Sequence, residues 1–412
     1  MKKNSPNNEA HSSEADESSR AAAISFVAAV KCADYDPCTV KNALERAILL
    51  LGGPSQFVKA GERIVLKPNL LLPAKVEEGV TTHPSIFRAA AEIFLQAGAV
   101  ITWGDSPGFG SAETVARKCG ILDAARGLNI SEADFKTAVE VHHTHAVQNK
   151  KLFLAKGAVE ADGVISLPRM KTHGMTRITC AIKNQFGCVP GLAKAEYHLK
   201  LPDISDFSRM LVDVCSAVNP RLYILDAVYA MEGNGPRSGI NRPLGLILVS
   251  ADPVALDSTV CRLMSVDVSL VPMLAHGESA GLGNFRPEKI QYLGDDITPF
   301  IRKSFDADRS PLIKKQSGNI MKFFRKNLTP RPVIIKKKCI SCGRCIEACP
   351  LSGKAIYFAD EKKIKKQIPC YNYSLCIRCF CCQEMCPEGA IKIHYNLFRR
   401  GIRAAENFCY RM

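Results

Sequence analysis

The chain has 412 residues, of which 47% are hydrophobic and 23% charged, as expected for a globular protein of two or three domains. Its net charge of +15 is uneven, because the residues from 301 onward hold 24 Lys and Arg against 8 Asp and Glu. Ten of the 18 cysteines fall between Cys339 and Cys386. Such clustering in a large chain indicates metal binding and argues against the disulfide scaffold of a short secreted protein.

The N-terminal segment, residues 1–20, mixes acidic side chains with Ser and Asn and predicts a disordered polar tail. It lacks the positively charged region of a secretory signal. The apolar run over 21–30 is too short to span a membrane. We therefore expect a cytoplasmic protein with no membrane span.

Residues 21–300 alternate short apolar strands with amphipathic helices. Pro84 predicts the start of a helix over 84–97, and Asp252 with Pro253 predicts the cap and first residue of another that ends near Met264. The expected strands lie at 64–66, 100–103, 164–167, 222–225 and 246–249. Continuous apolar strands that alternate with helices predict an α/β domain with a mostly parallel sheet covered by helices.

Each of these five strands runs into a polar, Gly-rich or Pro-rich loop, and in open α/β sheets the carboxyl edge is where ligands bind. The candidate catalytic residues are Lys67, Asp105, Lys171, His173, Lys183 and Asp226. The candidate substrate-binding residues are Asn69, His83, Asn184, Asn234 and Asp252. Each also has a purely structural interpretation: Asp252 as a helix cap, His83 as a helix start, Lys67 as a surface charge, and the Gly and Pro residues as turns.

The densest group of polar candidates lies in one short stretch. Lys171, His173, Lys183 and Asn184 fall near Arg169 and Arg177, with few acids between them. Such a group suits an anionic substrate, either a carboxylate or a phosphate. The nearby run His142-His143-x-His145 has no acid or Cys beside it, and we expect it to be a surface loop.

A basic linker is expected over 301–332, with a short basic helix near 320–328. Up to Lys338 this region holds 12 basic and 2 acidic groups. An iron–sulfur domain is then expected over 333–395, and a basic tail over 396–412.

Two cysteine motifs of identical spacing occupy this C-terminal region. The first is Cys339-x2-Cys342-x2-Cys345-x3-Cys349-Pro350, and the second is Cys376-x2-Cys379-x2-Cys382-x3-Cys386-Pro387. Three closely spaced thiolates wrap three corners of a 4Fe–4S cluster, and the fourth Cys ligates the other cluster. The spacing predicts two 4Fe–4S clusters. Cluster 1 is assigned to Cys339, Cys342, Cys345 and Cys386, and cluster 2 to Cys376, Cys379, Cys382 and Cys349.

Matching apolar segments follow each motif, at 355–358 and 390–393, as short strands should in a duplicated unit. The region resembles the two-cluster bacterial-type ferredoxin domain, a small α+β fold. Two zinc sites are the alternative, although zinc sites normally pair two nearby ligands with two others. Cys381 is an alternative ligand to Cys382, but only Cys382 keeps the spacing of the first motif.

The larger domain resembles the family of the domain of unknown function number 362 over residues 64–263. The matching motifs are Lys67-Pro68-Asn69, Thr82-His83-Pro84, Gly104-Asp105-Ser106-Pro107-Gly108, Lys171-Thr172-His173, Lys183-Asn184-Gln185-Phe186-Gly187, Glu232-Gly233-Asn234-Gly235-Pro236 and Asp252-Pro253-Val254-Ala255-Leu256-Asp257. Members of that family often carry a C-terminal ferredoxin module. The resemblance implies this architecture and no agreed reaction.

The leading functional hypothesis is an iron–sulfur electron-transfer protein. Its clusters would pass single electrons to a redox partner, expected to be acidic, or to a small anionic substrate at the α/β domain. A nucleic-acid-binding protein with structural clusters is one alternative, but aromatic residues make up only 7% of the chain and no nucleic-acid motif is present. A cluster-regulated transferase or hydrolase is the other. No nucleotide fingerprint or nucleophile elbow is found.

Overall fold

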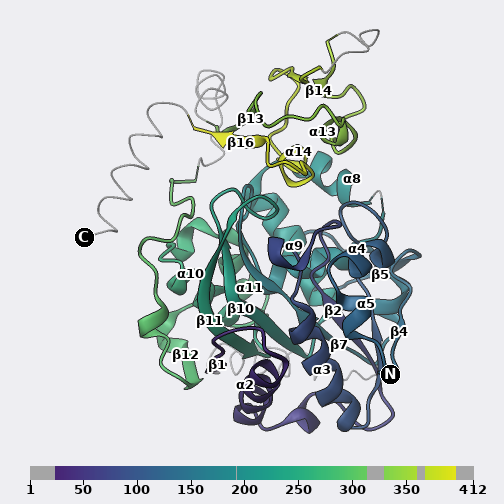
Figure 1. Ribbon diagram of the computed structural model, residues 1–412, viewed down its shortest axis with the longest axis vertical. Coiled ribbons are helices and arrows are strands. Elements are labelled where there is room, and N and C mark those ends of the chain that lie inside the picture. Colours follow the sequence, from purple (N-terminus) through teal and green to yellow (C-terminus); the bar gives the residue numbers. More distant parts are fainter. Residues whose placement is uncertain (1–23, 192, 313–328, 360–366, 396–412) are drawn as a thin grey trace, which may run out of the picture.

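The computed structural model describes residues 24–191, 193–312, 329–359 and 367–395. A large α/β domain spans 24–312, and a small cysteine-rich domain formed by 329–395 sits over one end of it (Figure 1). The predicted tail at 1–20, the helix near 320–328 and the basic tail at 396–412 lie outside the described residues. None of the helices in the described ranges is both long and apolar enough to cross a membrane.

The large domain is built on a ten-stranded sheet. Its main path runs β12 (Ile290–Gly294), β1 (Ser25–Lys31), β11 (Ile240–Ser250), β10 (Leu222–Glu232), β7 (Gly163–Leu167), β2 (Arg63–Pro68), β3 (Val100–Trp103) and β4 (Ser131–Glu132). From β10 to β4 the neighbours are parallel, and β11 is antiparallel to both β10 and β1. The predicted α/β class with a mostly parallel sheet is confirmed.

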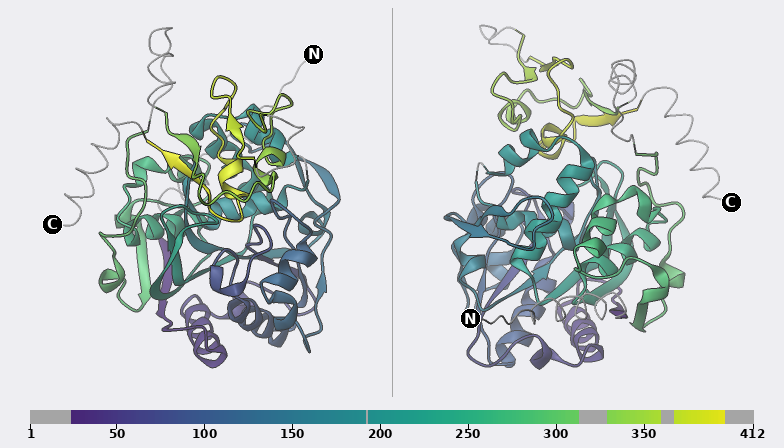
Figure 2. Two further views of the ribbon diagram at one scale, coloured as in Figure 1. Left: turned by 45° about the horizontal axis from the view of Figure 1, so that its top comes forward. Right: turned by 180° about the vertical axis from the view of Figure 1, so that it is seen from behind.

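Helices cover both faces of this sheet (Figure 2). One face packs against α2 (Pro37–Leu50), α3 (Pro84–Gln96), α4 (Ala112–Lys118) and α5 (Ile121–Ala124). The other packs against α7 (Ala181–Asn184), α9 (Ile204–Val218), α10 (Pro253–Leu263) and α11 (Pro272–Ser279). The cause is strand alternation: in β2, Ile64 and Leu66 face the first helix layer, and Val65 faces the opposite side.

Two smaller hairpins complete the large domain. The hairpin of β8 (Arg169–His173) and β9 (Arg177–Thr179) joins the sheet through parallel pairing of β8 with β10. It lies at the end of the sheet that faces the cysteine-rich domain (Figure 1). The hairpin of β5 (Ala138–His142) and β6 (Lys151–Ala155) forms a separate two-stranded sheet. The β8–β9 hairpin matters for function, since it carries two of the candidate side chains to the domain boundary.

The direction of β11 contradicts one expectation. β10 and β11 are joined by a short loop, and short connections join antiparallel neighbours. Ser250 at the end of β11 therefore pairs with Tyr223 near the start of β10. The prediction that five strand ends gather at one edge is wrong for β11, and Asp252 lies at the opposite edge of the sheet.

The described part of the predicted linker is not a free connection. Phe305 and Ala307 are buried in the core of the α/β domain, and Arg309 donates to the backbone carbonyls of Met264 and Ser265. Residues 301–312 thus pack as part of the larger domain. Their apolar side chains alternate with charged ones, so the composition of this segment does not indicate that it packs in the core.

The cysteine-rich domain has the short strands expected of a duplicated unit. β13 (Arg331–Ile334) pairs with β16 (Ile391–His394), and β14 (Ile356–Tyr357) pairs with β15 (Cys370–Tyr371), both antiparallel. Single-turn helices α13 (Arg344–Glu347) and α14 (Cys381–Glu384) lie within the two cysteine motifs. The domain is therefore held together by few strand pairs and by its cysteine loops.

Candidate functional site

Two small cavities in the cysteine-rich domain are each lined by four cysteines. The first, called cage 1 here, is lined by Cys339, Cys342, Cys345 and Cys386. The second, cage 2, is lined by Cys349, Cys376, Cys379 and Cys382. Each cage combines three thiols from one motif with the fourth thiol of the other motif. The chemistry of this donor set fits a 4Fe–4S cluster, which requires four cysteine thiolates.

The thiols of each cage surround a space and do not converge on one point. In the described ranges, no group of three or more His, Cys, Asp or Glu side chains is placed to hold a single metal ion. Cys381 does not line cage 2 and faces another cavity instead.

Hydrogen bonds reach sulfurs of both cages. The Tyr371 hydroxyl donates to Cys382 Sγ at 3.2 Å, and the backbone N–H of Ala390 donates to Cys386 Sγ at 3.2 Å. Donors of this kind tune the reduction potential of a bound cluster.

The segment between Cys382 and Cys386 contacts the large domain. Gln383 Nε2 donates to Asn234 Oδ1 at 3.1 Å and to the carbonyl of Gly235 at 3.1 Å. Glu384 Oε1 lies 3.0 Å from His173 Nε2. Met385 packs in a small apolar cluster with Leu72, Ala74, Val80 and Met231 of the large domain. All three residues of this spacer are buried, so the cysteine-rich domain docks through α14 and the residue that follows it, in a segment that also carries cage residues.

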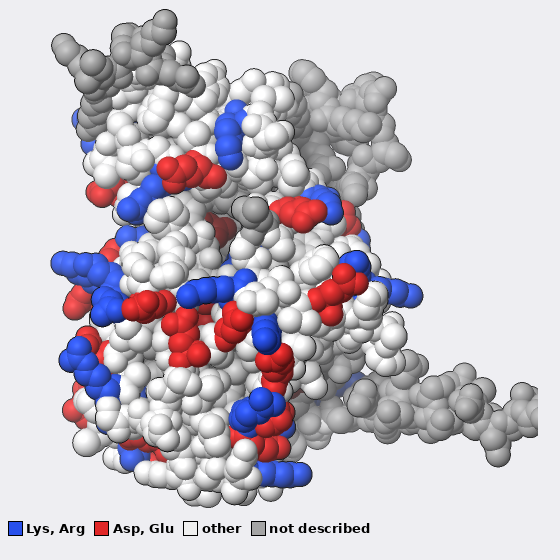
Figure 3. Space-filling view, turned by 90° about the vertical axis from the view of Figure 1, so that its right-hand side faces the viewer, with Lys and Arg blue, Asp and Glu red and all other residues white. Residues whose placement is uncertain are grey.

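Between the docked domains lies a cavity of about 420 Å³. On the face turned to the right of Figure 1, the surface is hollowed where the smaller upper domain meets the larger lower one (Figure 3). The large domain lines the cavity with Asn69, Leu71, Asp105, Lys171, Lys183, Asn184, Lys194 and His198, among others. The cysteine-rich domain lines it with Glu347, Ala348, Cys349, Pro350, Lys354, Cys381, Glu384 and Met385. A cavity of this size between two domains is a typical small-molecule site.

Cys349 is shared between this interdomain cavity and cage 2. No cysteine of cage 1 lines the cavity in the described part of the chain. Of the two cages, cage 2 is therefore the one that borders the interdomain cavity.

A buried ion pair lies beside the cavity, which Asp105 lines. Lys67 Nζ lies 2.9 Å from Asp105 Oδ1, and both side chains are almost fully buried. Asp105 Oδ2 also accepts the backbone N–H of Leu70 at 2.6 Å, which joins the loops after β2 and β3. A Cβ at Gly187 would collide with Asp105, so only glycine fits beside this pair. Lys67 is thus a buried partner of Asp105 and not the surface charge that its sequence allowed.

Three lysines form one wall of the interdomain cavity. Burial lowers the pKa of Lys171 to about 7, helped by the neighbouring positive charges of Arg169 and Lys183. Burial also lowers the pKa of Lys183, and it lowers the pKa of Lys194 to about 8. Desolvated like charges of this kind are stabilised by an anion between them. The wall therefore suits an anionic group.

The lysines differ in how they are held. Lys171 Nζ donates to Asn69 Oδ1 at 2.5 Å and to the Val80 carbonyl at 2.6 Å, and Lys194 Nζ donates to the Ser106 carbonyl. Lys183 has neither a hydrogen bond nor an ion pair with any residue that the structure describes, and its Nζ lies over the Phe186 ring, 5.9 Å from the centroid. Lys183 is consequently the cation most available to a ligand.

His173 is oriented by the backbone. Its Nδ1 accepts the N–H groups of Met175 and Thr176, which leaves the proton of the neutral ring on Nε2, facing Glu384. Burial lowers the pKa of His173, and the nearby Lys183 lowers it further. For Glu384, burial opposes ionisation, but the contact with His173 and the positive charge of Lys183 outweigh burial and lower the pKa to about 2. This contact therefore pairs a neutral imidazole with a carboxylate across the domain boundary.

Three predicted site residues lie elsewhere. Asp226 and His83 belong to a separate buried cluster, in which Asp226 accepts from Arg169 at 2.9 Å and from the Tyr35 hydroxyl at 2.7 Å. His83 stacks on Tyr35 with ring centroids 3.5 Å apart and accepts the N–H of Ser85 as the cap of α3. Asp252 caps α10 at the far edge of the sheet. The contacts favour the structural interpretations of Asp252 as a helix cap and of His83 as a helix start.

The remaining candidates gather at the domain boundary. Five of them line the interdomain cavity: Asn69, Asp105, Lys171, Lys183 and Asn184. Asn234 contacts the cysteine-rich domain directly, where its Nδ2 donates to the Ile391 carbonyl at 3.1 Å.

Sequence reasoning missed Lys194 and Glu384. Lys194 lies in α8 (Ala193–Lys200), outside any recognised motif. Glu384 lies between two cysteines of a motif that is defined by its cysteines and not by the residues between them. The one available signal was the pair of polar side chains, Gln383 and Glu384, inside a spacer of only three residues.

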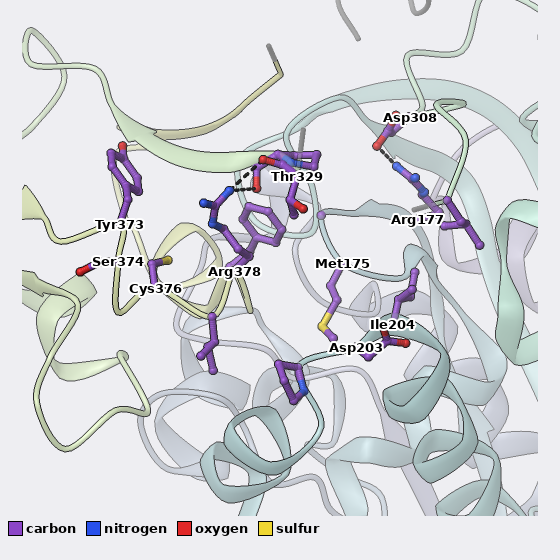
Figure 4. A pocket seen from close by; sticks show the side chains of 16 residues that line it. Met175, Arg177, Asp203, Ile204, Asp308, Thr329, Tyr373, Ser374, Cys376 and Arg378 are labelled. Atoms are coloured by element: carbon purple, nitrogen blue, oxygen red, sulfur yellow. Dashed lines mark hydrogen bonds and ion pairs between the residues drawn. The ribbon is translucent and has the colours of Figure 1, made fainter. Parts of the chain in front are cut away.

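A second pocket, of about 500 Å³, lies on another side of cage 2 (Figure 4). Met175, Asp203 and Ile204 line it from the large domain, and Tyr373, Cys376 and Arg378 from the small one. Arg378 donates to the carbonyls of Thr329 and Pro330, at 2.8 and 3.2 Å, so this cation is already engaged.

Two family models match the chain. The one described as Domain of unknown function (DUF362) covers residues 64–262, and the one described as a 4Fe-4S dicluster domain covers residues 338–390. A thylakoid-associated protein of Synechocystis sp. is 36% identical over 260 residues, which are 63% of this chain and 80% of that protein. An uncharacterized ferredoxin of Methanocaldococcus jannaschii is 36% identical over 61 residues, which are 15% of this chain and 74% of that protein.

Solved structures resemble the chain more distantly. The lactate racemase apoprotein of Thermoanaerobacterium thermosaccharolyticum aligns with a TM-score of 0.38 at 13% identity, over 60% of this chain and 58% of that one. A Thermotoga maritima protein aligns with a TM-score of 0.35 at 11% identity, over 56% of this chain and 59% of that one. The chain thus spans less than two thirds of either solved protein.

The two predicted resemblances are confirmed in their order along the chain. A 4Fe-4S dicluster domain at 338–390 makes this an iron–sulfur protein. The relative of which 80% is covered at 36% identity, with the family model over the larger domain, shows that the chain belongs to the family of the Domain of unknown function DUF362 and carries a C-terminal 4Fe–4S dicluster domain.

Proposed function

We propose that this protein transfers single electrons through two 4Fe–4S clusters to a small anionic substrate bound in the interdomain cavity. The first cluster would be held by Cys339, Cys342, Cys345 and Cys386, and the second by Cys349, Cys376, Cys379 and Cys382. Such clusters, when bound, accept and release one electron at a time.

The observation that carries the proposal is the position of Cys349. This residue lines cage 2 and the interdomain cavity at once, so a ligand in the cavity lies next to a cage sulfur. A substrate here is separated from the second cluster by little more than one side chain.

The residues around the cavity have distinct roles in this proposal. Lys183 supplies the cation that binds the anionic group, and Lys171, fixed by Asn69 and Val80, supplies a second. The Lys67–Asp105 pair holds the Leu70 loop in place. Leu71, Ala348 and Met385, among others, provide apolar walls that exclude water.

The test is anaerobic reconstitution followed by iron and sulfide counting and a redox titration monitored by electron paramagnetic resonance. The expected result is about eight irons and eight sulfides per chain, in two centres that are reduced reversibly. Zinc in place of iron and sulfide, or centres that cannot be reduced, would refute the proposal.

Two controls separate the alternative functions. Gel shifts with unrelated DNA duplexes at low salt should show no binding, since a nucleic-acid-binding protein would bind through its basic groups. Replacing all eight cage cysteines with Ser should abolish any turnover. A folded variant that retained turnover would indicate a transferase or hydrolase without redox chemistry.

A further inference from the structure

The two cages differ in what surrounds them. Cage 2 borders the interdomain cavity through Cys349, whereas cage 1 borders solvent through Cys342, whose side chain is exposed. If cage 2 faces the substrate, cage 1 is the end of the pair that an outside protein can approach.

Three exposed lysines directly precede cage 1 in the chain, and the cage itself is lined by the exposed Ile340 and by one exposed acid, Glu388. We call the surface formed by Lys336, Lys337, Lys338, Ile340 and Cys342 the cage-1 patch. The three lysines follow β13 and are exposed, and their side chains make no ion pair within the described ranges. Ile340 is 52% exposed and lines the mouth of the cage. Unpaired cations within a few residues of one exposed apolar side chain are typical of a docking surface that attracts an acidic partner.

The second pocket, drawn in Figure 4, is the alternative docking site for a partner protein, because Cys376 of cage 2 lines it. Its cations are already engaged: Arg378 with two backbone carbonyls, and Arg177 with Asp308. It therefore offers less free positive charge to an acidic protein than the cage-1 patch does.

We propose that the cage-1 patch docks an acidic one-electron carrier protein, which exchanges electrons with the first cluster. The inference rests on the proposed function and adds the partner class and the entry point. In each exchange the carrier loses one electron and the protein gains one, which then moves to the cage 2 side and the cavity. The acidic carrier is the reductant, and the substrate in the cavity is the oxidant.

The experiment uses the anaerobically reconstituted full chain and an acidic flavodoxin as the probe. The patch variant carries K336E, K337E and K338E. The matched control carries K118E, K136E and K150E, three exposed lysines of the large domain without ion pairs in its described part, so the change in net charge is the same. A third variant, I340S, tests the apolar contact. Iron and sulfide contents check that each variant retains its clusters.

Two measurements are made: the Kd for flavodoxin at low and high salt, and the rate of cluster reduction by reduced flavodoxin in stopped flow. At low salt, the patch variant should bind at least about tenfold more weakly and be reduced correspondingly more slowly, while the control variant behaves like the wild type. I340S should weaken binding at all salt concentrations. The difference caused by the lysines should shrink at high salt, because exposed charges are screened within about 10 Å at 0.1 M salt.

Reduction by photoreduced deazaflavin, a small neutral reductant, separates this inference from the proposed function. The patch variant and the control variant should be reduced by it at the wild-type rate. If deazaflavin reduces the wild type but the patch and control variants bind flavodoxin equally well, the docking inference is overturned and electron transfer stands. If the wild type cannot be reduced even by deazaflavin, electron transfer itself fails.

Discussion

The crosswise arrangement of the cages makes a quantitative prediction about iron content. Cys349 belongs to the first motif in sequence but lines the cavity formed by the second, and Cys386 is placed in the reverse way. Replacing Cys349 with Ser should therefore disturb cage 2, and replacing Cys386 should disturb cage 1. Because each cluster holds four irons, the loss of either should remove up to about four of about eight irons per chain.

Double variants distinguish crosswise from sequential ligation. Cys349 and Cys376 line the same cage, so the double variant C349S/C376S should lose no more iron than the more affected of the two single variants. Cys349 and Cys339 line different cages, so C349S with C339S should lose nearly all iron. The effects of residues that act together do not add, whereas independent effects do.

Iron and sulfide counting on anaerobically purified protein measures these losses, with electron paramagnetic resonance of the reduced samples as a second readout. C381S is the control, because this thiol faces the interdomain cavity and should be dispensable for both clusters. The reasoning would be refuted if C349S with C339S lost only one cluster while C349S with C376S lost both. That outcome would mean that each motif ligates its own cluster.

Three further predictions concern the site. Lys67→Met should lower the free energy of unfolding by about 3–5 kcal/mol in urea titration, because Asp105 is left buried without its partner; an unchanged midpoint would argue against the pair. Binding of sulfate, an anion whose charge is constant from pH 6 to 9, should weaken in calorimetry as the pH rises through about 7, where Lys171 loses its proton; equal affinity across this range would show that Lys171 does not contribute. Tyr371→Phe should shift the midpoint potential of one cluster to a more negative value in a redox titration, because the reduced cluster loses the hydroxyl donor at Cys382 Sγ. A shift to a more positive potential would contradict this role.

Local sequence signals predicted those features that depend on neighbours along the chain. Strand β3 is formed by the residues expected, and α3 and α10 begin at the prolines that marked them. The cysteine spacing acts over a few residues in the same way, and the structure gathers the eight thiols into the two predicted groups of four. Such features need no knowledge of distant contacts, because caps, strand alternation and loop spacing are local.

The composition of the interdomain cavity depended on long-range packing. Asn69, Asp105 and Lys171 were predicted from strand ends, because parallel strands carry their ends to one edge, and Lys183 and Asn184 were predicted from the dense polar stretch that follows Lys171. Asp252 was misplaced because nothing in a strand's own residues states whether its neighbour runs parallel or antiparallel to it.

By itself, the sequence determined the two-domain order, the α/β class and the eight cage thiols, since each is encoded in short-range spacing or in a recognisable motif. Only the tertiary structure decided that Gln383, Glu384 and Met385 dock the small domain, and that Cys349 borders a cavity closed by both domains. The physical reason is that a surface between two separately folded units arises from complementary shapes and charges far apart in the chain. The residues on each side of that surface show no sequence periodicity or composition from which the residues on the other side could be predicted.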